Sequence, residues 1–133
     1  MARWTAFAAT AATSLVATLG LASDTLAVGR ATAIEARGVA IEFFRSQNER
    51  RYDDTCRLLS NGFIRSHRLR DRRTCSALLR VNSVWNLRIE YRIGSVALDG
   101  ARVVVQAVVD RVPGQLVMVR EAGNLRILAV EGP

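Results

Sequence analysis

The first regular pattern in the chain is helical and runs from residue 31 to about residue 51. Apolar side chains recur there every three or four residues, and charged side chains fall between them. The apolar set consists of Ile34, Ala40, Ile41, Phe43 and Phe44. The two adjacent phenylalanines are the largest of these side chains, so we expect them to anchor the core.

Two shorter helices are expected after this one. Asp53 is a suitable N-cap for a helix over residues 55–60, because its carboxylate accepts hydrogen bonds from the first turn. Asn61-Gly62 is expected to end that helix, since Gly is common just past a helix C-terminus. Beyond a charged loop over residues 66–74, the apolar pattern of residues 75–81 predicts one or two further helical turns.

From residue 88 onward the period of the pattern is two, which predicts strands. Four strands are expected, over residues 88–98 with a bulge or bend at Gly94, and over residues 101–112, 115–121 and 125–131. The turns between them are expected at Asp99-Gly100, Pro113-Gly114 and residues 122–124.

The second strand has a clear apolar face, formed by Val103, Val105, Ala107 and Val109. Helices followed by an antiparallel meander indicate an α+β fold. We therefore expect N-terminal helices packed on one face of a curved four-stranded antiparallel sheet.

The first 27 residues differ from the rest in composition. Arg3 carries the only charge as far as Ser23, and Ala, Thr, Leu and Val dominate the run. A basic residue, an apolar run and small residues near its end are typical of a signal peptide cleaved on export. About 20 apolar residues also suffice to span a bilayer, so a retained anchor and an ordinary helix are alternatives. We expect a signal peptide or anchor over residues 1–27 and one domain over residues 28–133.

Composition excludes several kinds of chemistry. All 19 basic residues are Arg, against 12 acidic residues, which gives a formal net charge of +7. Without Lys there is no Schiff base, no pyridoxal phosphate attachment and no phosphate-loop lysine. One His and two Cys are too few for a multi-histidine or four-cysteine metal site in one chain. We expect no metal and no cofactor.

The two cysteines, Cys56 and Cys75, are expected to form a structural disulfide if the chain is exported, because oxidising compartments favour disulfides. The closed loop would stabilise the fold by roughly 3 kcal/mol in the chain-entropy model. The alternative is a pair of buried free thiols in a cytosolic protein. A disulfide would agree with the secreted or cell-envelope location that we expect for the protein.

The most basic part of the chain lies between residues 65 and 73. Guanidinium groups bind phosphate and carboxylate groups bidentately, so five residues are candidate anion-binding residues: Arg65, Arg68, Arg70, Arg72 and Arg73. The alternatives are a solvated loop, contact with anionic lipids or wall polymers outside the membrane, and contact with an acidic protein. No nucleic-acid partner is expected, because export removes it and no aromatic residues stand between the arginines.

The order of motifs resembles a known superfamily. A helix with paired Phe is followed by Tyr52-Asp53-Asp54, by Cys56-Arg57-Leu58-Leu59-Ser60, and by Cys75 with a leucine-rich turn; four strands then follow. This layout is similar to the nuclear transport factor 2-like superfamily, also called the cystatin-like cone or SnoaL-like fold. Within it, the chain resembles small exported proteins of high-GC Gram-positive bacteria with a two-cysteine helix pair. One departure is Leu125, where relatives often have an aromatic residue.

The resemblance implies a cone-shaped sheet around the first helix, with a cavity at its open end. The residues expected to line that cavity are Phe43, Phe44, Trp85, Tyr91 and Met118. The superfamily includes isomerases, dehydratases, adaptors and proteins without a known ligand, so the fold does not imply one function. In an enzyme of this kind the cavity acid would be Glu90 or Asp110, although strand residues of this type are more often solvated.

Three functions follow from these patterns. We expect an exported, non-catalytic domain that binds a small apolar ligand or a cell-envelope partner. The first alternative is an isomerase- or dehydratase-like enzyme, which an inward-facing acid beside Tyr91 in an open pocket would favour. The second is an adaptor that dimerises through its sheet, which a filled cone and an exposed apolar sheet face would favour. No catalytic role is expected for His67, since its neighbours Ser66 and Asp71 are too close in sequence for a triad.

Overall fold

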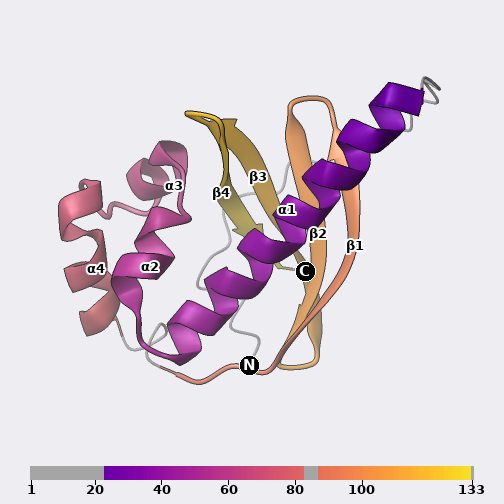
Figure 1. Cartoon of the computed structure of the whole chain (residues 1–133). Coiled ribbons are helices and arrows are strands. Elements are labelled where there is room, and N and C mark those ends of the chain that lie inside the picture. Colours follow the sequence, from indigo (N-terminus) through magenta and orange to yellow (C-terminus); the bar gives the residue numbers. More distant parts are fainter. Residues whose placement is uncertain (1–22, 83–86, 133) are drawn as a thin grey trace.

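The computed structural model describes residues 23–82 and 87–132, with side chains from Gly29 onward. In this part of the chain four helices precede four strands (Figure 1): α1 Ser23–Asn48, α2 Tyr52–Arg57, α3 Asn61–Ser66, α4 Arg72–Val81, β1 Tyr91–Asp99, β2 Arg102–Val109, β3 Val112–Glu121 and β4 Asn124–Glu131. The strands form an antiparallel sheet in the order β1-β2-β3-β4. The expected α+β class, with N-terminal helices on a four-stranded antiparallel sheet, is confirmed.

Helix α1 crosses one face of the sheet diagonally (Figure 1) and supplies the centre of the core. Its buried residues recur at helical spacing and include Ala36, Ala40, Phe43 and Phe44. Ile34, which the pattern placed with them, is 73% exposed. The helix begins at Ser23 rather than at residue 31, so it includes the last residues of the expected leader. Cleavage of that leader stays a prediction, and residues 1–22 lie outside the described part.

The sheet is not strongly curled, and in this it differs from the cone that the resemblance implies. Sheets curve mainly at bulges. The central strands β2 and β3 pair without interruption along their whole length. The interruptions lie in the outer strand pairs, at Gly94-Ser95 of β1 and at Leu128 of β4. The irregularity expected at Gly94 is therefore confirmed, but the centre of the sheet has no bulge that would curl it.

Two of the three expected turns are confirmed. Gly100 and Gly123 have φ angles of +59° and +82°, which Gly adopts without strain. The turn expected at Pro113-Gly114 is wrong, because both residues lie in β3 and the turn is Asp110-Arg111, with φ angles of +49° and +69°. Proline is tolerated there because β3 pairs with β4 only from Gln115 onward, so its missing N–H removes no hydrogen bond between those strands.

The boundaries of the short helices also differ from expectation. Asn61-Gly62 begins α3 instead of ending a helix. Ser60 explains the difference, because its backbone is extended and its Oγ accepts a hydrogen bond from the backbone N–H of Phe63 at 3.0 Å. Asp53 is not an N-cap, since α2 already begins at Tyr52.

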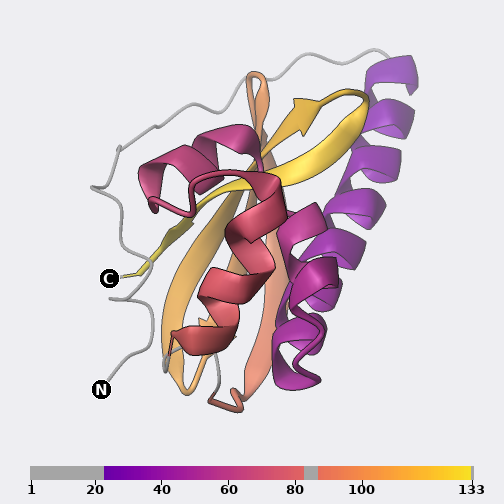
Figure 2. The same ribbon diagram turned by 90° about the vertical axis from the view of Figure 1, so that its left-hand side faces the viewer.

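The connection between α2 and α3 pairs with the outer edge of β4. The N–H of Ser60 donates to the carbonyl of Ile127 at 2.8 Å, and the N–H of Ile127 donates to the carbonyl of Leu58 at 2.7 Å. This parallel bridge covers part of an edge that would otherwise expose unpaired backbone groups. The three short helices therefore gather beside β4, as Figures 1 and 2 show.

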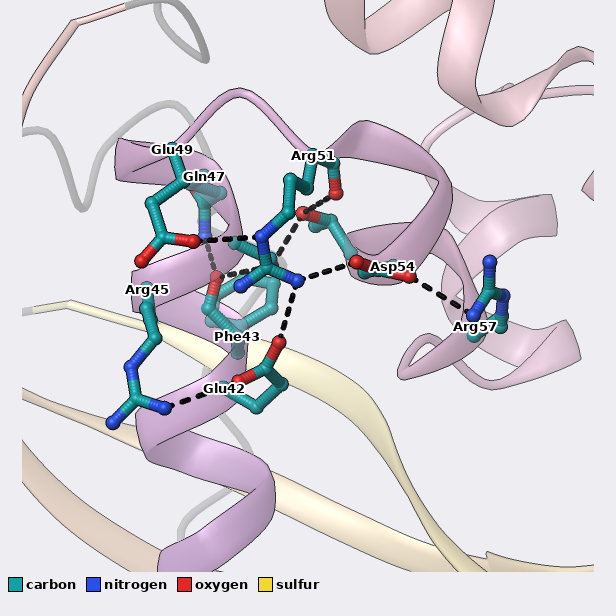
Figure 3. A network of polar contacts seen from close by, with 10 residues as sticks. Glu42, Phe43, Arg45, Gln47, Glu49, Arg51, Asp54 and Arg57 are labelled. Carbon is teal, nitrogen blue, oxygen red and sulfur yellow. Dashed lines mark hydrogen bonds and ion pairs between the residues drawn. The ribbon is translucent and has the colours of Figure 1, made fainter.

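Arg51 holds α2 against the end of α1 (Figure 3). Its guanidinium contacts the carboxylates of three residues, namely Glu49, Asp54 and Glu42. These hydrogen bonds, with that to Glu49 the strongest influence, raise the pKa of Arg51 above its ordinary value. Nearby, the hydroxyl groups of Ser46 and Thr55 are 2.6 Å apart, and both residues are buried. Together these contacts fix the position of α2, and with it that of Cys56.

Cys56 and Cys75 form the expected disulfide, with Cα atoms 6.1 Å apart. Both residues are buried. The bond joins α2 to α4, and so it anchors the helix that follows the arginine-rich segment.

Candidate anion-binding turn

The candidate arginines lie where α3 passes into α4, and we call residues 65–73 the Arg turn. Its centre is Leu69, which is only 9% exposed and whose backbone N–H and carbonyl are both hydrogen-bonded. The residues on either side, Arg68 and Arg70, have φ angles of +54° and +62°. A buried, hydrogen-bonded leucine thus holds two exposed arginines in the left-handed backbone region.

Asp71 fixes the end of the Arg turn. Its Oδ1 accepts a hydrogen bond from the backbone N–H of Thr74 at 2.9 Å, and the Thr74 hydroxyl lies against the Asp71 backbone in a capping box. The bond from the Thr74 N–H is the main cause that lowers the pKa of Asp71 below its ordinary value. Because this cap starts α4 at Arg72, both Arg72 and Arg73 are helical and do not belong to the loop expected over residues 66–74.

Four arginines of the Arg turn are exposed, namely Arg65, Arg68, Arg70 and Arg73. None of the four forms an ion pair with another described residue. Asp71 is the only acidic residue between them in the sequence; its carboxylate caps α4, and the charge of Arg73 contributes in a minor way to lowering the pKa of Asp71. The Arg turn therefore presents a local excess of positive charge to solvent.

Arg72 differs from its neighbours because its guanidinium is occupied within the fold. Nη1 donates to the carbonyl of Cys56 at 2.6 Å, and Nη2 donates to Oδ1 of Asn61 at 3.0 Å. Nη2 also lies 3.5 Å from the carboxylate of Glu121. Arg72 thus joins α4 to the end of α2, to the start of α3 and to β3, and four rather than five candidate arginines are free to meet a ligand.

His67 lies at the end of α3 and forms no triad with its neighbours. Its ring stacks on Phe63, with centroids 3.9 Å apart. Nδ1 lies 3.1 Å from the carbonyl of Phe63 and 3.0 Å from Oγ of Ser66. The carboxylate of Asp71 bonds to Thr74 instead. The imidazole therefore packs against α3, and none of its hydrogen bonds to described residues involves a carboxylate.

The residues expected to line a cone cavity lie mainly in the core. Phe43 and Met118 are fully buried, and Phe44 is 3% exposed. Phe44 stacks on Tyr91, with ring centroids 5.0 Å apart. Trp85 lies outside the described residues. These contacts give the four described side chains packing partners within the protein, and their role as a ligand site stays a prediction.

An open pocket that the sequence did not indicate lies beside the β2–β3 turn. Its volume is about 340 Å³, and it is lined by Glu90, Tyr91, Arg92, Val108 and Arg111. Asp110, the other acid considered, accepts a hydrogen bond from the N–H of Glu90 at 3.0 Å and donates its own N–H to the Glu90 carbonyl at 2.9 Å. Because side chains alternate along an extended chain, the sequence indicates that Glu90 and Arg92 share a face. It did not indicate that Arg111 joins them, because the turn was expected at Pro113-Gly114 and Arg111 was therefore assigned to a strand.

No family model, curated protein sequence or solved structure matches the chain. None of the helices within residues 23–82 and 87–132 is a candidate membrane span. The same residues contain no group of three or more His, Cys, Asp or Glu side chains placed to hold a metal ion.

Proposed function

We propose that the protein is an exported, non-catalytic domain that binds phosphate-bearing components of the cell envelope through the Arg turn. The observation that supports this most strongly is the set of four exposed arginines without ion pairs in the described part of the chain. Guanidinium groups bind phosphate oxygens bidentately. An arginine without an internal partner can do so without first breaking an ion pair.

The rigidity of the Arg turn supports the same proposal. The capping box at Asp71, the buried Leu69 and the disulfide at Cys75 all constrain the backbone that holds the arginines. A preorganised site loses less conformational entropy when its ligand binds, so more of the interaction free energy appears as affinity.

Two features support export. The disulfide between Cys56 and Cys75 is consistent with an oxidising compartment outside the cytoplasm. The apolar run after Arg3 is typical of a leader segment. In that compartment, lipid head groups and wall polymers are the phosphate-bearing partners within reach.

We also propose that the chain is a divergent member of the nuclear transport factor 2-like superfamily. Its support is the order of helices and strands, together with a disulfide between the second and fourth helices. Binding of an apolar ligand inside a cone has less support, because Phe43 and Phe44 are packed in the core. Glu90 and Tyr91 both line the open pocket beside the β2–β3 turn. The enzyme alternative still has less support, because the Tyr91 ring stacks on Phe44 toward the core and the carboxylate of Asp110 accepts the backbone N–H of Glu90.

Dimerisation through the sheet is a second candidate function, because an apolar row runs across the outer face. Ala97, Val104, Val117 and Ala129 pair side by side across all four strands. Ala97 is exposed and Val104 and Ala129 are partly exposed, whereas Val117 is only 5% exposed. Light scattering after size-exclusion chromatography tests it. A mass of two chains for the wild type and one chain for Val104→Glu is expected from this alternative, and a monomeric wild type would contradict it.

Binding to defined anionic probes tests the main proposal. The protein purified from an exporting host is mixed with phosphatidylglycerol vesicles, phosphatidylcholine vesicles and a soluble glycerol phosphate polymer. The test variant changes Arg65, Arg68, Arg70 and Arg73 to Gln. The control variant changes four other exposed arginines to Gln, namely Arg30, Arg37, Arg50 and Arg102.

The wild type and the control are expected to bind one of the two anionic probes. Binding to the phosphatidylglycerol vesicles would indicate a lipid partner, and binding to the glycerol phosphate polymer would indicate a wall-polymer partner. The test variant should bind at least ~10-fold more weakly, since each Arg near an anionic surface contributes about 1 kcal/mol. Equal losses in both variants would show that only net charge matters, and no binding to either anionic probe would also refute the proposal.

A further inference from the structure

A second ligand site can be derived from the pocket beside the β2–β3 turn. Arg92 of β1 and Val108 of β2 stand directly opposite each other in the sheet. Their neighbours Tyr91 and Val109 are also paired and face the core. Since side chains alternate along a strand, Arg92 and Val108 lie on the outer face.

Glu90 belongs to the same face. It directly precedes β1 and is held beside the turn by two hydrogen bonds: the N–H of Asp110 donates to the Glu90 carbonyl, and the N–H of Glu90 donates to Oδ1 of Asp110. Glu90 is two residues from Arg92, so both side chains rise from the same side of the sheet. Arg111, the second residue of the turn, completes the wall of the pocket.

The chemistry of this pocket is mixed. The residues that line it include two arginines, Arg92 and Arg111, one glutamate, Glu90, and the apolar or aromatic residues Val108 and Tyr91. Neither arginine forms an ion pair with another described residue. Arg111 also has a φ angle of +69°, a region that costs a residue with a Cβ about 1–2 kcal/mol. The turn itself would be better served by Asn or Gly, so the fold does not explain an arginine at this position.

We propose that this pocket binds a small zwitterion, with its carboxylate between Arg92 and Arg111 and its ammonium group on Glu90. A carboxylate suits the fork of two guanidiniums. A ligand with only negative charge would face Glu90, and a ligand with only positive charge would face both arginines. An apolar side chain on the ligand would cover Val108. The volume of about 340 Å³ is at the lower end of small-molecule sites, which suits a ligand the size of an amino acid.

Nuclear magnetic resonance titration with a matched set of three probes tests this site. The probes are leucine, 4-methylpentanoate, which lacks the amino group, and 3-methylbutylamine, which lacks the carboxylate. Leucine should produce saturable amide shifts at residues 90–92, 108 and 111. It should bind more tightly than 4-methylpentanoate, and the amine alone should produce no saturable shift.

Variants at the pocket test the arginines and the glutamate separately. Arg92→Gln with Arg111→Asn should weaken leucine binding at least ~10-fold, which corresponds to about 1.4 kcal/mol, and Asn tolerates the left-handed turn. Glu90→Gln should abolish the preference for leucine over 4-methylpentanoate. Arg102→Gln, an exposed arginine at the far end of β2, is the matched control and should bind like the wild type.

The proposal is wrong if leucine produces no saturable shift at these residues, or if the double variant binds leucine as well as the wild type. It is also wrong if the amine alone binds as tightly as leucine. The Arg turn stays intact in every variant, so a failure here is independent of the proposed envelope binding.

Discussion

Arg72 and Arg73 are neighbours in the sequence, but their surroundings give them different roles. Arg72 donates to the Cys56 carbonyl and to Asn61, whereas Arg73 is exposed and forms no ion pair within the described residues. Both lie in the first turn of α4. The sequence indicates a cluster of arginines here, but which guanidinium is occupied depends on where Cys56, Asn61 and β3 lie in space.

Replacing these two arginines separately measures the difference. Arg72→Ala is expected to lower the free energy of unfolding by roughly 1–3 kcal/mol, because it leaves a part-buried carbonyl and Asn61 without their donor. Arg73→Ala removes the same charge and should change it by less than about 0.5 kcal/mol. Urea denaturation at neutral pH measures both, and equal losses would argue against a structural role for Arg72.

At the scale of elements, α1 is tied to the β3–β4 hairpin by one ion pair. Arg120 donates to both carboxylate oxygens of Glu35, at 2.9 and 3.2 Å, across a separation of 85 residues. Glu35 also accepts the backbone N–H of Leu125 at 3.3 Å. The hydrogen bond from Arg120 is the main cause that lowers the pKa of Glu35 below its ordinary value of 4.5.

This contact should make stability depend on pH in the acid range. Because the carboxyl has a lower pKa in the folded than in the unfolded protein, its contribution is complete above pH 4.5 and is lost as the pH falls through the folded-state pKa. Glu35→Gln should therefore be less stable at neutral pH and should lose less stability on acidification. Urea midpoints measured from about pH 6 to pH 3 check this. Asp71 is present in both proteins, so parallel pH profiles would show that Glu35 contributes nothing.

The elements that the sequence predicted well are those with a strong local period. Alternation identified the buried face of β2, and glycines located the turns at Gly100 and Gly123. The errors occurred where a non-local partner decides the outcome. Ser60 starts a new helix because its backbone is held by Ile127 of β4, and the β2–β3 turn is set by strand register rather than by Pro113-Gly114. For the same reason the pocket lined by Arg111 could not be predicted, because the strand register places this residue in the turn.

At the scale of the whole molecule, the disulfide and the high positive charge both support the proposed binding to anionic surfaces. The net charge of +7 favours contact with anionic surfaces. The bond between Cys56 and Cys75 spans a separation of 19 residues and encloses the Arg turn. Covalent closure of this loop thus stabilises the segment on which the proposed function depends.

Opening the disulfide should lower the free energy of unfolding by about 3 kcal/mol, the value expected for a loop of this length. The reduced wild type and the double variant Cys56→Ala with Cys75→Ala should show the same loss in the free energy of unfolding. Adding reductant should not change the stability of the variant. A mass spectrum without reductant should show the exported protein two hydrogens lighter than its dithiol form. Free thiols in that protein would remove the main support for an extracytoplasmic location.

The central claim is that the Arg turn holds this protein at the cell envelope, and its distribution in an exporting host tests that claim most directly. The wild type, the variant with Gln at Arg65, Arg68, Arg70 and Arg73, and the control with Gln at Arg30, Arg37, Arg50 and Arg102 are each quantified in the envelope and in the medium. We expect the wild type and the control in the envelope fraction and the Arg-turn variant in the medium. The same distribution for all three proteins would contradict the account.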